Sequence, residues 1–190
     1  MLTIEEIKAY LKENLKESRY THTLGVAKCA VELSKINNIS LERAEIAGLA
    51  HDVAKNLPKD QMEKIIKDNN IVLSDVEKNN SQLWHSIIAP IVARDKLNIE
   101  DEEILDAIRW HTTGKEDMSV LAKIIYIADM IEENRSFPGV DEIRKITFED
   151  LDKGVYSGLK HSIEFLLKQD ALIDINTINA RNYFLMHMKE

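Results

Sequence analysis

The stretch LAHDVAK, residues 49–55, sets an imidazole and a carboxylate side by side within an apolar pattern typical of a helix interior. Leu49 and Ala50 come before the polar pair His51 and Asp52, and Val53 resumes the apolar pattern after it. An unpaired carboxylate in a protein core costs so much free energy that it usually finds a partner or takes up a proton. We therefore expect a partner beside Asp52.

The sequence on both sides of this stretch has the spacing of amphipathic helices. Ile4, Ile7 and Leu11 recur at steps of three and four residues, and Thr3 with Glu6 forms a capping-box pattern at the start of the helix. Further helices are expected over residues 18–36, over the segment after Ser40 that contains LAHDVAK, and over residues 59–69, 81–96, 101–110, 119–134, 149–169 and 176–188. The segment 119–134 is apolar on nearly all sides, which predicts the central, most buried helix.

Two short segments, residues 71–73 and 171–175, have a strand-like pattern. They are too few to build a sheet, so the sequence predicts an all-α protein with a single domain over residues 1–190. A loop over residues 136–139 divides a core of about residues 18–135 from a helical C-terminal tail of about residues 141–190.

Composition excludes several classes of protein. The net charge of −8 argues against a broad nucleic-acid surface, because such binding depends on many lysines and arginines. Cys29 has no second cysteine to pair with, the N-terminus lacks the apolar region of a signal peptide, and the apolar segment 120–131 is too short to span a bilayer. We expect a cytoplasmic protein that binds neither nucleic acid nor membrane.

Several polar side chains share the apolar surroundings of the His51–Asp52 pair. They are His22, His51, Asp52, His85, His111 and Asp129. Each alone is usually a satisfied core residue, but a metal centre would satisfy all six together. Nitrogen and oxygen ligands without a thiolate suit Fe, Mn, Zn, Ni or Co better than Mg or Ca.

The order of these residues along the chain resembles that of the HD superfamily of metal-dependent phosphohydrolases, which is named after the His-Asp pair. The motifs that carry the resemblance are SRYTHTLGVA, AGLAHDVAK, WHSIIAP, AIRWHTTGKEDM and IADMIEENRSFPGVDEIR. HTTG and ADMIEENRSFPG point to the YqeK-type subgroup, which is similar to symmetrical bis(5′-nucleosyl)-tetraphosphatases. The resemblance implies an HD-domain-like helical bundle whose metal-binding core is about residues 18–135.

The resemblance also implies a centre of two divalent transition-metal ions, with iron as the expected metal. One ion would be held by His22, His51, Asp52 and Asp129, and Asp52 would bridge to a second ion held by His85 and His111. Asp52 and Lys55 would act in catalysis, and Lys55 would lie one helical turn after His51 on the same face. The substrate would be bound by Arg19, Lys55, Thr113, Gly114 and Arg135, with backbone N–H groups donated by Thr113 and Gly114.

The activity implied is the symmetrical hydrolysis of diadenosine tetraphosphate to two ADP by a metal-activated water at the dinuclear centre. The expected partner is therefore a dinucleoside polyphosphate, with ADP or GDP as a product-like ligand. Two alternatives stay open: hydrolysis of a mononucleotide, a cyclic nucleotide or a guanosine polyphosphate, and a non-catalytic nucleotide-binding helical module. The sequence allows either a monomer or a homodimer.

Overall fold

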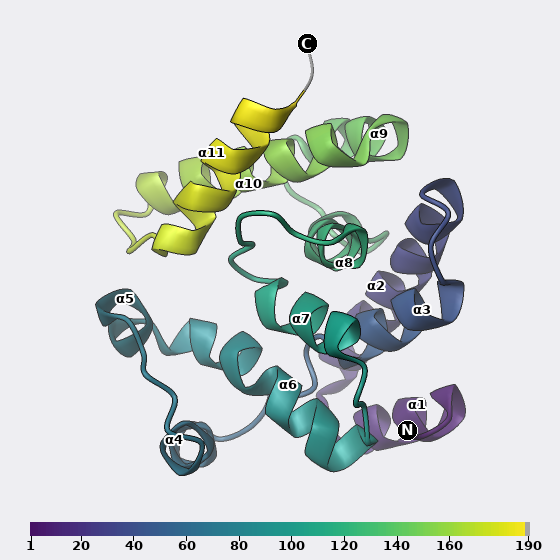
Figure 1. The fold of residues 1–190 in the computed structure, drawn as a ribbon, viewed down its shortest axis with the longest axis vertical. Helices are drawn as coiled ribbons and strands as arrows, with labels where there is room; N and C mark the ends of the chain where they lie inside the picture. The colour runs from purple at the N-terminus through teal and green to yellow at the C-terminus, as the bar shows by residue number, and fades with distance from the viewer. Residues whose placement is uncertain (189–190) are drawn as a thin grey trace.

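A computed structural model describes residues 1–188, and within this range it contains eleven α-helices, one short 3-10 helix and no β-strand. The predicted all-α fold is confirmed. In chain order the elements (Figure 1) are α1 (Ile4–Asn14), α2 (Glu17–Ile36), α3 (Leu41–Ala50), α4 (Lys59–Asp68), α5 (Asp75–Asn79), η1 (Ser81–Leu83), α6 (Trp84–Leu97), α7 (Glu102–Trp110), α8 (Val120–Ile131), α9 (Val140–Glu149), α10 (Leu151–Lys168) and α11 (Ile175–His187). Residues 189 and 190, which end the predicted C-terminal tail, lie outside the described residues.

Helix α8 occupies the centre of the bundle, with α7 below it and α9 to α11 above it in Figure 1. Its sequence is apolar on nearly all sides, and most of its side chains are buried. It packs against α2, α3, α7, α9 and α10. The Ser119 hydroxyl caps the helix by accepting a hydrogen bond from the Ala122 N–H at 3.1 Å. The predicted central helix is confirmed over Val120–Ile131, while residues 132–134 lie beyond its end.

Helices α2 and α3 approach each other so closely that their backbones are in contact. A Cβ atom at Gly48 would lie 2.7 Å from the Ala27 Cα atom, a distance that real Cβ atoms do not adopt. Only glycine therefore allows this approach. The contact holds the C-terminal end of α3, and with it the HD pair, against α2.

The LAHDVAK stretch is helical only at its beginning, so the prediction of a helix through it is wrong beyond Ala50. From there the chain continues in tighter turns, with i to i+3 hydrogen bonds from Val53 N–H to the Ala50 carbonyl (3.0 Å) and from Lys55 N–H to the Asp52 carbonyl (2.9 Å). Such turns rotate successive side chains further than an α-helix does. His51, Asp52 and Lys55 therefore project from a turn rather than from one face of a helix.

The two predicted strands are also wrong. Residues 71–73 connect α4 to α5, Val72 is 92% exposed, and no strand of the described chain pairs with this segment. Residues 171–174 lead into α11, which begins at Ile175. Hydrophobic side chains alone do not make a strand when no neighbour satisfies the backbone groups.

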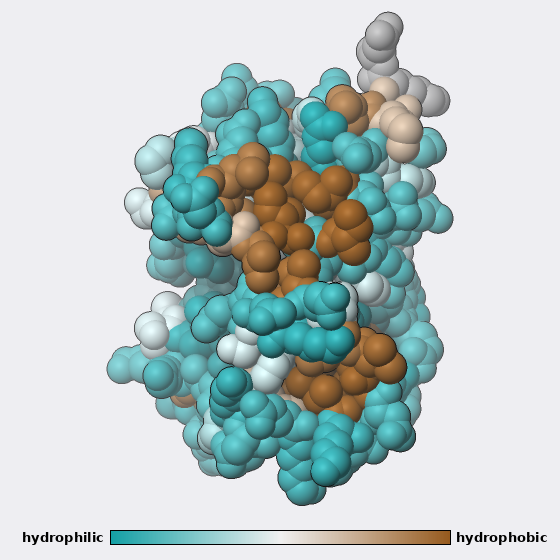
Figure 2. All heavy atoms as spheres, turned by 90° about the vertical axis from the view of Figure 1, so that its left-hand side faces the viewer, coloured by the Kyte–Doolittle hydropathy of each residue, from teal (hydrophilic) through white to brown (hydrophobic). Residues whose placement is uncertain are grey.

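No helix within residues 1–188 is both long enough and apolar enough to cross a lipid bilayer. The surface nevertheless carries apolar side chains in two patches on the face shown in Figure 2, with a band of polar side chains between them. The upper patch lies in the half of the molecule that contains α10 and α11.

Candidate metal centre

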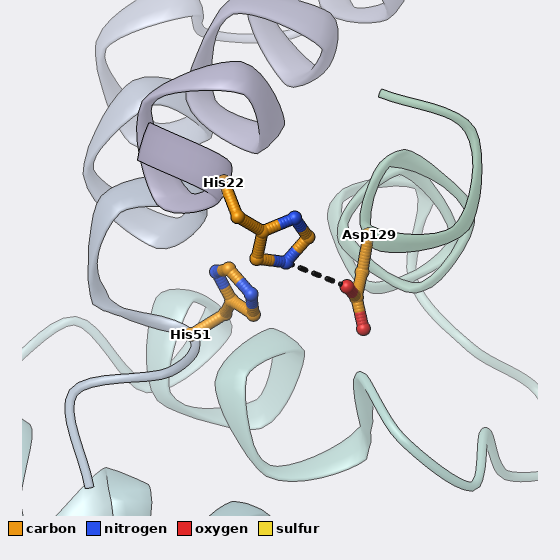
Figure 3. Close-up of side chains that lie close together, drawn as sticks. All are labelled: His22, His51 and Asp129. Atoms are coloured by element: carbon orange, nitrogen blue, oxygen red, sulfur yellow. Dashed lines mark ion pairs between the residues drawn. The ribbon is translucent and has the colours of Figure 1, made fainter. Parts of the chain in front are cut away.

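The six predicted ligand side chains converge from five separate parts of the fold. His22 comes from α2, His51 and Asp52 from the turns after α3, and His85 from α6. His111 follows the last residue of α7, and Asp129 lies in α8. His22, His51 and Asp129 point toward one another (Figure 3), and His22 Nε2 lies 2.9 Å from Asp129 Oδ1. We call the six residues the candidate metal centre.

The two oxygens of the Asp52 carboxylate face different members of the candidate metal centre. Oδ1 lies 3.3 Å from His85 Nε2 and 3.6 Å from His111 Nε2. Oδ2 lies 3.4 Å from His51 Nε2 and accepts a hydrogen bond from Arg19 Nη1 at 2.8 Å. The carboxylate thus lies between the histidine of the HD pair and the histidines of α6 and α7.

All four histidines of the candidate metal centre present Nε2 toward its interior. Nδ1 of His51, His85 and His111 each lies 2.7 Å from the backbone carbonyl oxygen three residues earlier in the chain. A carbonyl oxygen only accepts hydrogen bonds, so each Nδ1 carries a proton and donates the hydrogen bond. In a neutral imidazole the remaining nitrogen, Nε2, then carries a lone pair that a metal ion can use.

Two buried acceptors of the candidate metal centre have no partner in the described part of the chain: His51 Nε2 and Asp52 Oδ1 lack a hydrogen-bond donor among residues 1–188. His85 Nε2 and His111 Nε2, which are both acceptors in this tautomer, lie only 3.2 Å apart. Buried acceptors that face one another are costly unless a cation or proton lies between them.

The donor set therefore fits a divalent metal ion. Two overlapping groups have ligand atoms within 4.8 Å of one another: His22, His51 and Asp129 form one, and His51, Asp52 and His111 form the other. Imidazole nitrogens and carboxylate oxygens, with no thiolate among them, suit a transition metal.

Both carboxylates of the candidate metal centre are ionised at neutral pH. Burial raises the pKa of Asp52, but the imidazoles of His51, His111 and His85, when Nε2 carries a proton in place of a metal ion, lower it more, so the pKa lies well below its usual range. Burial has the same opposing effect on Asp129, whose pKa is also held well below its usual range by His22, His51 and Arg135. Burial lowers the pKa of His85 to about 4, which keeps that imidazole neutral.

Glu132 is a buried carboxylate that sequence reasoning missed. It lies just beyond the end of α8, is 2% exposed, and accepts a hydrogen bond from His22 Nδ1 at 3.1 Å. Its other oxygen accepts from the backbone N–H of Asn134 at 2.7 Å and from the Asn134 side chain at 3.0 Å. The carboxylate thereby sets the tautomer and orientation of His22, as carboxylates behind metal-binding histidines commonly do. The acidic run after α8 was its only signal in the sequence.

The three predicted cationic side chains lie at the candidate metal centre. Arg19 pairs with Asp52, and Arg135 pairs with Asp129 and also donates to its backbone carbonyl at 2.7 Å. The Lys55 ammonium lies 3.2 Å from His85 Nε2. Burial lowers the pKa of Lys55, and the Asp52 charge acts in the opposite direction.

The HTTG segment offers fewer free hydrogen-bond donors than the sequence suggested. Thr113 is buried and its hydroxyl donates to the Gly114 carbonyl at 3.0 Å. The Gly114 N–H already donates to the Trp110 carbonyl at 2.9 Å, so it is not a free donor for a substrate. Thr112, which sequence reasoning did not select, is nearer to the histidines, with its hydroxyl 3.0 Å from His111 Nε2.

A cavity of about 510 Å³ opens beside the candidate metal centre. Lys55, His85, His111, Asp129 and Arg135 line it on that side. A second cavity of about 210 Å³ shares Lys55 and His85 with the first. The Lys55–His85 pair therefore lies between two spaces that a long ligand can enter.

Comparison with known proteins agrees with this geometry. Residues 19–134 match the family description "HD domain". The chain is 39% identical to the symmetrical bis(5′-nucleosyl)-tetraphosphatase of Bacillus subtilis (strain 168), covering 95% of this chain and 97% of that one. A protein of the same name from Staphylococcus aureus (strain NCTC 8325 / PS 47) is 35% identical, covering 96% of this chain and 95% of the other.

A solved structure shares the whole fold. The crystal structure of an HD superfamily hydrolase from Clostridium acetobutylicum, described as involved in NAD metabolism, is 44% identical with a TM-score of 0.95. The match covers 99% of this chain and 100% of that one. The resemblance to the superfamily and to the tetraphosphatase subgroup is thereby confirmed, and this chain belongs to the HD domain family.

Proposed function

We propose that this protein hydrolyses a dinucleoside polyphosphate, diadenosine tetraphosphate in the first place, to two molecules of ADP. The symmetrical tetraphosphatases of Bacillus subtilis and Staphylococcus aureus match nearly the whole chain, which supports this substrate. The observation that carries the proposal is the candidate metal centre itself, where buried acceptors with no partner in the described chain lie beside a cavity. Water attacks the phosphorus on one side of the central bridging oxygen, that P–O bond breaks, and the bridging oxygen leaves with the other ADP.

We further propose that two divalent transition-metal ions are bound, with iron as the expected metal and Mn, Zn, Ni or Co as alternatives. The two overlapping ligand groups, which share His51, support the number two. When bound, such ions lower the pKa of a water and neutralise charge on the attacked phosphoryl group.

The side chains of the protein have separate roles in this proposal. His22, His51, Asp52 and Asp129 would hold one ion, and Asp52, His85 and His111 the other. Asp52, whose low pKa keeps it ionised, would act in catalysis through its negative charge, by orienting the metal ions and the attacking water. Burial of these ligands would strengthen their electrostatic attraction to the metal ions, because little water screens them.

Cations would bind the phosphates of the substrate. Lys55 and Arg135 line the larger cavity, so they are placed to donate hydrogen bonds to phosphate oxygens. Arg19, which pairs with Asp52, and Thr113, which lines the cavity, would also contact the substrate. The Gly114 N–H is not included, because it is already bonded to Trp110. The three cations would supply local positive charge for an anionic substrate, in a protein whose net charge is −8.

Other parts of the proposal concern partners and location. ADP or GDP would bind as a product-like ligand, and the protein would act in the cytoplasm as a monomer or homodimer. The buried thiol of Cys29 fits that location, because it has no second cysteine with which to form a disulfide.

Product analysis tests the proposal. The metal-loaded protein is incubated separately with diadenosine tetraphosphate, a mononucleotide, a cyclic nucleotide and a guanosine polyphosphate. We expect ADP as the sole product from the first and little turnover of the others. His111→Gln should abolish the activity, whereas His187→Gln should not, because His187 is exposed in α11. Turnover of another nucleotide without turnover of diadenosine tetraphosphate would overturn the proposal.

A further inference from the structure

The lining of the larger cavity is of two kinds. Lys55, Asp129 and Arg135 are charged side chains that belong to the candidate metal centre or contact it, and this part of the lining suits phosphates. The lining also includes Phe137, Met130, Phe165, Leu166 and Leu172, and its exposed surface is mostly apolar. A polyphosphate chain would gain nothing from this apolar part.

We propose that the apolar part of the cavity binds one nucleoside of the substrate, with the base against Phe137 and His161 and with the Tyr126 hydroxyl hydrogen-bonded to the nucleoside. This inference rests on the proposed function and adds to it the residues that recognise the nucleoside. It involves none of the six residues of the candidate metal centre.

Phe137 and His161 form one aromatic surface in the cavity wall. Phe137 lies in the loop between α8 and α9, and His161 lies in α10. Their ring centroids are 4.6 Å apart and their planes are tilted by 32°, so the two rings form one partly exposed aromatic surface on which a base can lie. Stacking of a base on an aromatic side chain stabilises nucleotide binding whatever the identity of the base.

Tyr126 supplies the polar contact that an apolar pocket needs for orientation. Tyr126 is 3% exposed and lines the cavity, and its hydroxyl faces the Ser162 side chain but makes no hydrogen bond of normal geometry within residues 1–188. A buried tyrosine hydroxyl normally has a partner. A polar atom of a bound nucleoside would provide one, and the neighbouring Ser162 hydroxyl lines the same cavity.

The close packing of α10 on α8 brings these groups together. A Cβ atom at Gly158 would lie 2.8 Å from Ile127 Cδ1 and 3.2 Å from Met130 Sδ, so the ends of these two α8 side chains pack directly against α10 at this glycine. His161 and Ser162 follow within about one helical turn, on the same helix. This packing places them near Tyr126 of α8.

The mouth of the cavity exposes apolar side chains to solvent. Phe165 is 56% exposed and Leu172 is 50% exposed. The upper apolar patch of Figure 2 lies in this half of the molecule. Contiguous exposed apolar surface commonly marks a ligand or interaction site. A cavity of about 510 Å³ has the size usual for a small-molecule site.

Calorimetric titration of the metal-loaded protein tests the aromatic contact, with ADP and inorganic pyrophosphate as separate ligands. Phe137→Ala and His161→Ala should each weaken ADP binding about tenfold or more, because one stacked base contributes that much. Pyrophosphate binding should change less than about twofold, since it lacks a base. Phe148→Ala is the matched control, because Phe148 is an exposed aromatic side chain that does not line the cavity.

Unchanged ADP affinity in both aromatic variants would overturn the inference. An equal loss for ADP and pyrophosphate would also overturn it, because the variants would then act through the phosphate site.

Tyr126→Phe gives an independent test, because a purely structural role of the hydroxyl would predict a lower melting temperature in this variant. Removing an unpartnered buried hydroxyl should leave the melting temperature of the free protein unchanged or raise it. The same change should weaken ADP binding about fivefold, the value of one ordinary hydrogen bond. Tyr10→Phe in α1 is the control. A lower melting temperature with unchanged ADP affinity would overturn the role of Tyr126.

The failure of this inference is distinguishable from the failure of the proposed function. ADP binding that depends on Phe137, without hydrolysis of diadenosine tetraphosphate, would support the nucleoside site and refute the proposed function. If diadenosine tetraphosphate is hydrolysed but ADP affinity is unchanged in the Phe137 and His161 variants, only the nucleoside site is refuted. If Phe165→Ala instead dissociates a dimer on gel filtration and leaves ADP affinity unchanged, a second copy of the chain covers the patch and the inference is wrong.

Discussion

The carboxylate of Glu132 accepts a hydrogen bond from Nδ1 of His22 at 3.1 Å, although 110 positions separate the two residues. On the other side of the ring, Nε2 lies 2.9 Å from Asp129 Oδ1. Glu132 therefore fixes the direction in which the His22 lone pair points, without belonging to the candidate metal centre.

We expect Glu132→Ala to lower metal affinity by about 10- to 100-fold, the usual effect of removing the partner behind a metal-binding histidine. Glu132→Gln should have a smaller effect, because its amide oxygen still accepts a hydrogen bond. Metal content after dialysis against a graded chelator measures the change. Glu133→Ala is the matched control, because Glu133 is exposed and pairs with Lys28 at the surface. Equal metal retention in the Glu132 and Glu133 variants would contradict the role of Glu132.

Gly25 allows Glu132 to occupy its position. A Cβ atom at residue 25 would overlap Glu132 Oε2, and the two hydrogen bonds from Asn134 prevent that oxygen from moving freely. Gly25→Ala should therefore displace the carboxylate and lower metal affinity about as much as Glu132→Ala.

The double variant separates this explanation from a general packing defect. With Glu132 already removed, Gly25→Ala should cost little further affinity, so the two effects should be clearly non-additive. Metal affinities of the two single variants and the double variant measure the coupling. Fully additive losses would show that Gly25 acts independently of Glu132.

The sequence was informative about groups whose role depends on local pattern. Apolar periodicity predicted most of the long helices, and the polar residues within or just beyond those helices included every member of the candidate metal centre. Their assignment as metal ligands stays a prediction, as does the single domain over residues 1–190. Helix α9 was not predicted, because it buries only Val140, Ile143 and Thr147 and so has a weak apolar pattern.

Features that depend on distant contacts were not visible in the sequence. Glu132 resembles the exposed acidic residues beside it until α2 brings His22 against it. The aromatic surface of Phe137 and His161 joins a loop to a helix that begins more than ten residues later. The turn at His51 likewise depends on the packing of α2 against α3, since the apolar pattern runs on through Ala54.

Metal removal should destabilise the protein, because an ion that binds only the folded state stabilises it. At a free metal concentration about 100 times the dissociation constant, that stabilisation corresponds to roughly 5–10 °C in melting temperature for a chain of this size. Calorimetry before and after chelation measures the shift, and elemental analysis before chelation should give two metal ions per chain. Chelation should lower the melting temperature of the Asp129→Asn variant less than that of the unchanged protein. A melting temperature that ignores the chelator would favour a non-catalytic helical module.

The chelated protein should lose stability as the pH falls from about 6.5 to about 4. Burial lowers the pKa of His85 to about 4 in the folded state, below its value of about 6.5 in an unfolded chain. The unfolded state therefore binds more protons within this window, and unfolding becomes easier as the pH falls. The groups that face His85 are Asp52, His111, Lys55 and Thr112. Both carboxylates of the centre have lowered pKa values in the folded state, so the stability that they contribute is lost only below about pH 4.

Denaturant unfolding of the chelated protein at pH 7 and pH 5 checks this. We expect His85→Gln to reduce the loss of unfolding free energy between these pH values by up to about 2 kcal/mol. His187→Gln serves as the control, since His187 is exposed. The same pH dependence in His85→Gln as in the unchanged protein would show that another group is responsible.

Asp52→Asn should abolish activity while leaving the fold intact. The substitution preserves the shape of the side chain but removes the charge that lies between Arg19 and the histidines, and it leaves an amide N–H₂ that cannot bind a metal ion. We expect a loss of at least about 100-fold in kcat/KM, since changes even behind the ligands of a metal site cost 10- to 100-fold. Circular dichroism should show unchanged helix content, and Asp60→Asn on the exposed surface of α4 should remain fully active. An active, metal-loaded Asp52→Asn protein would place the reaction elsewhere in the molecule.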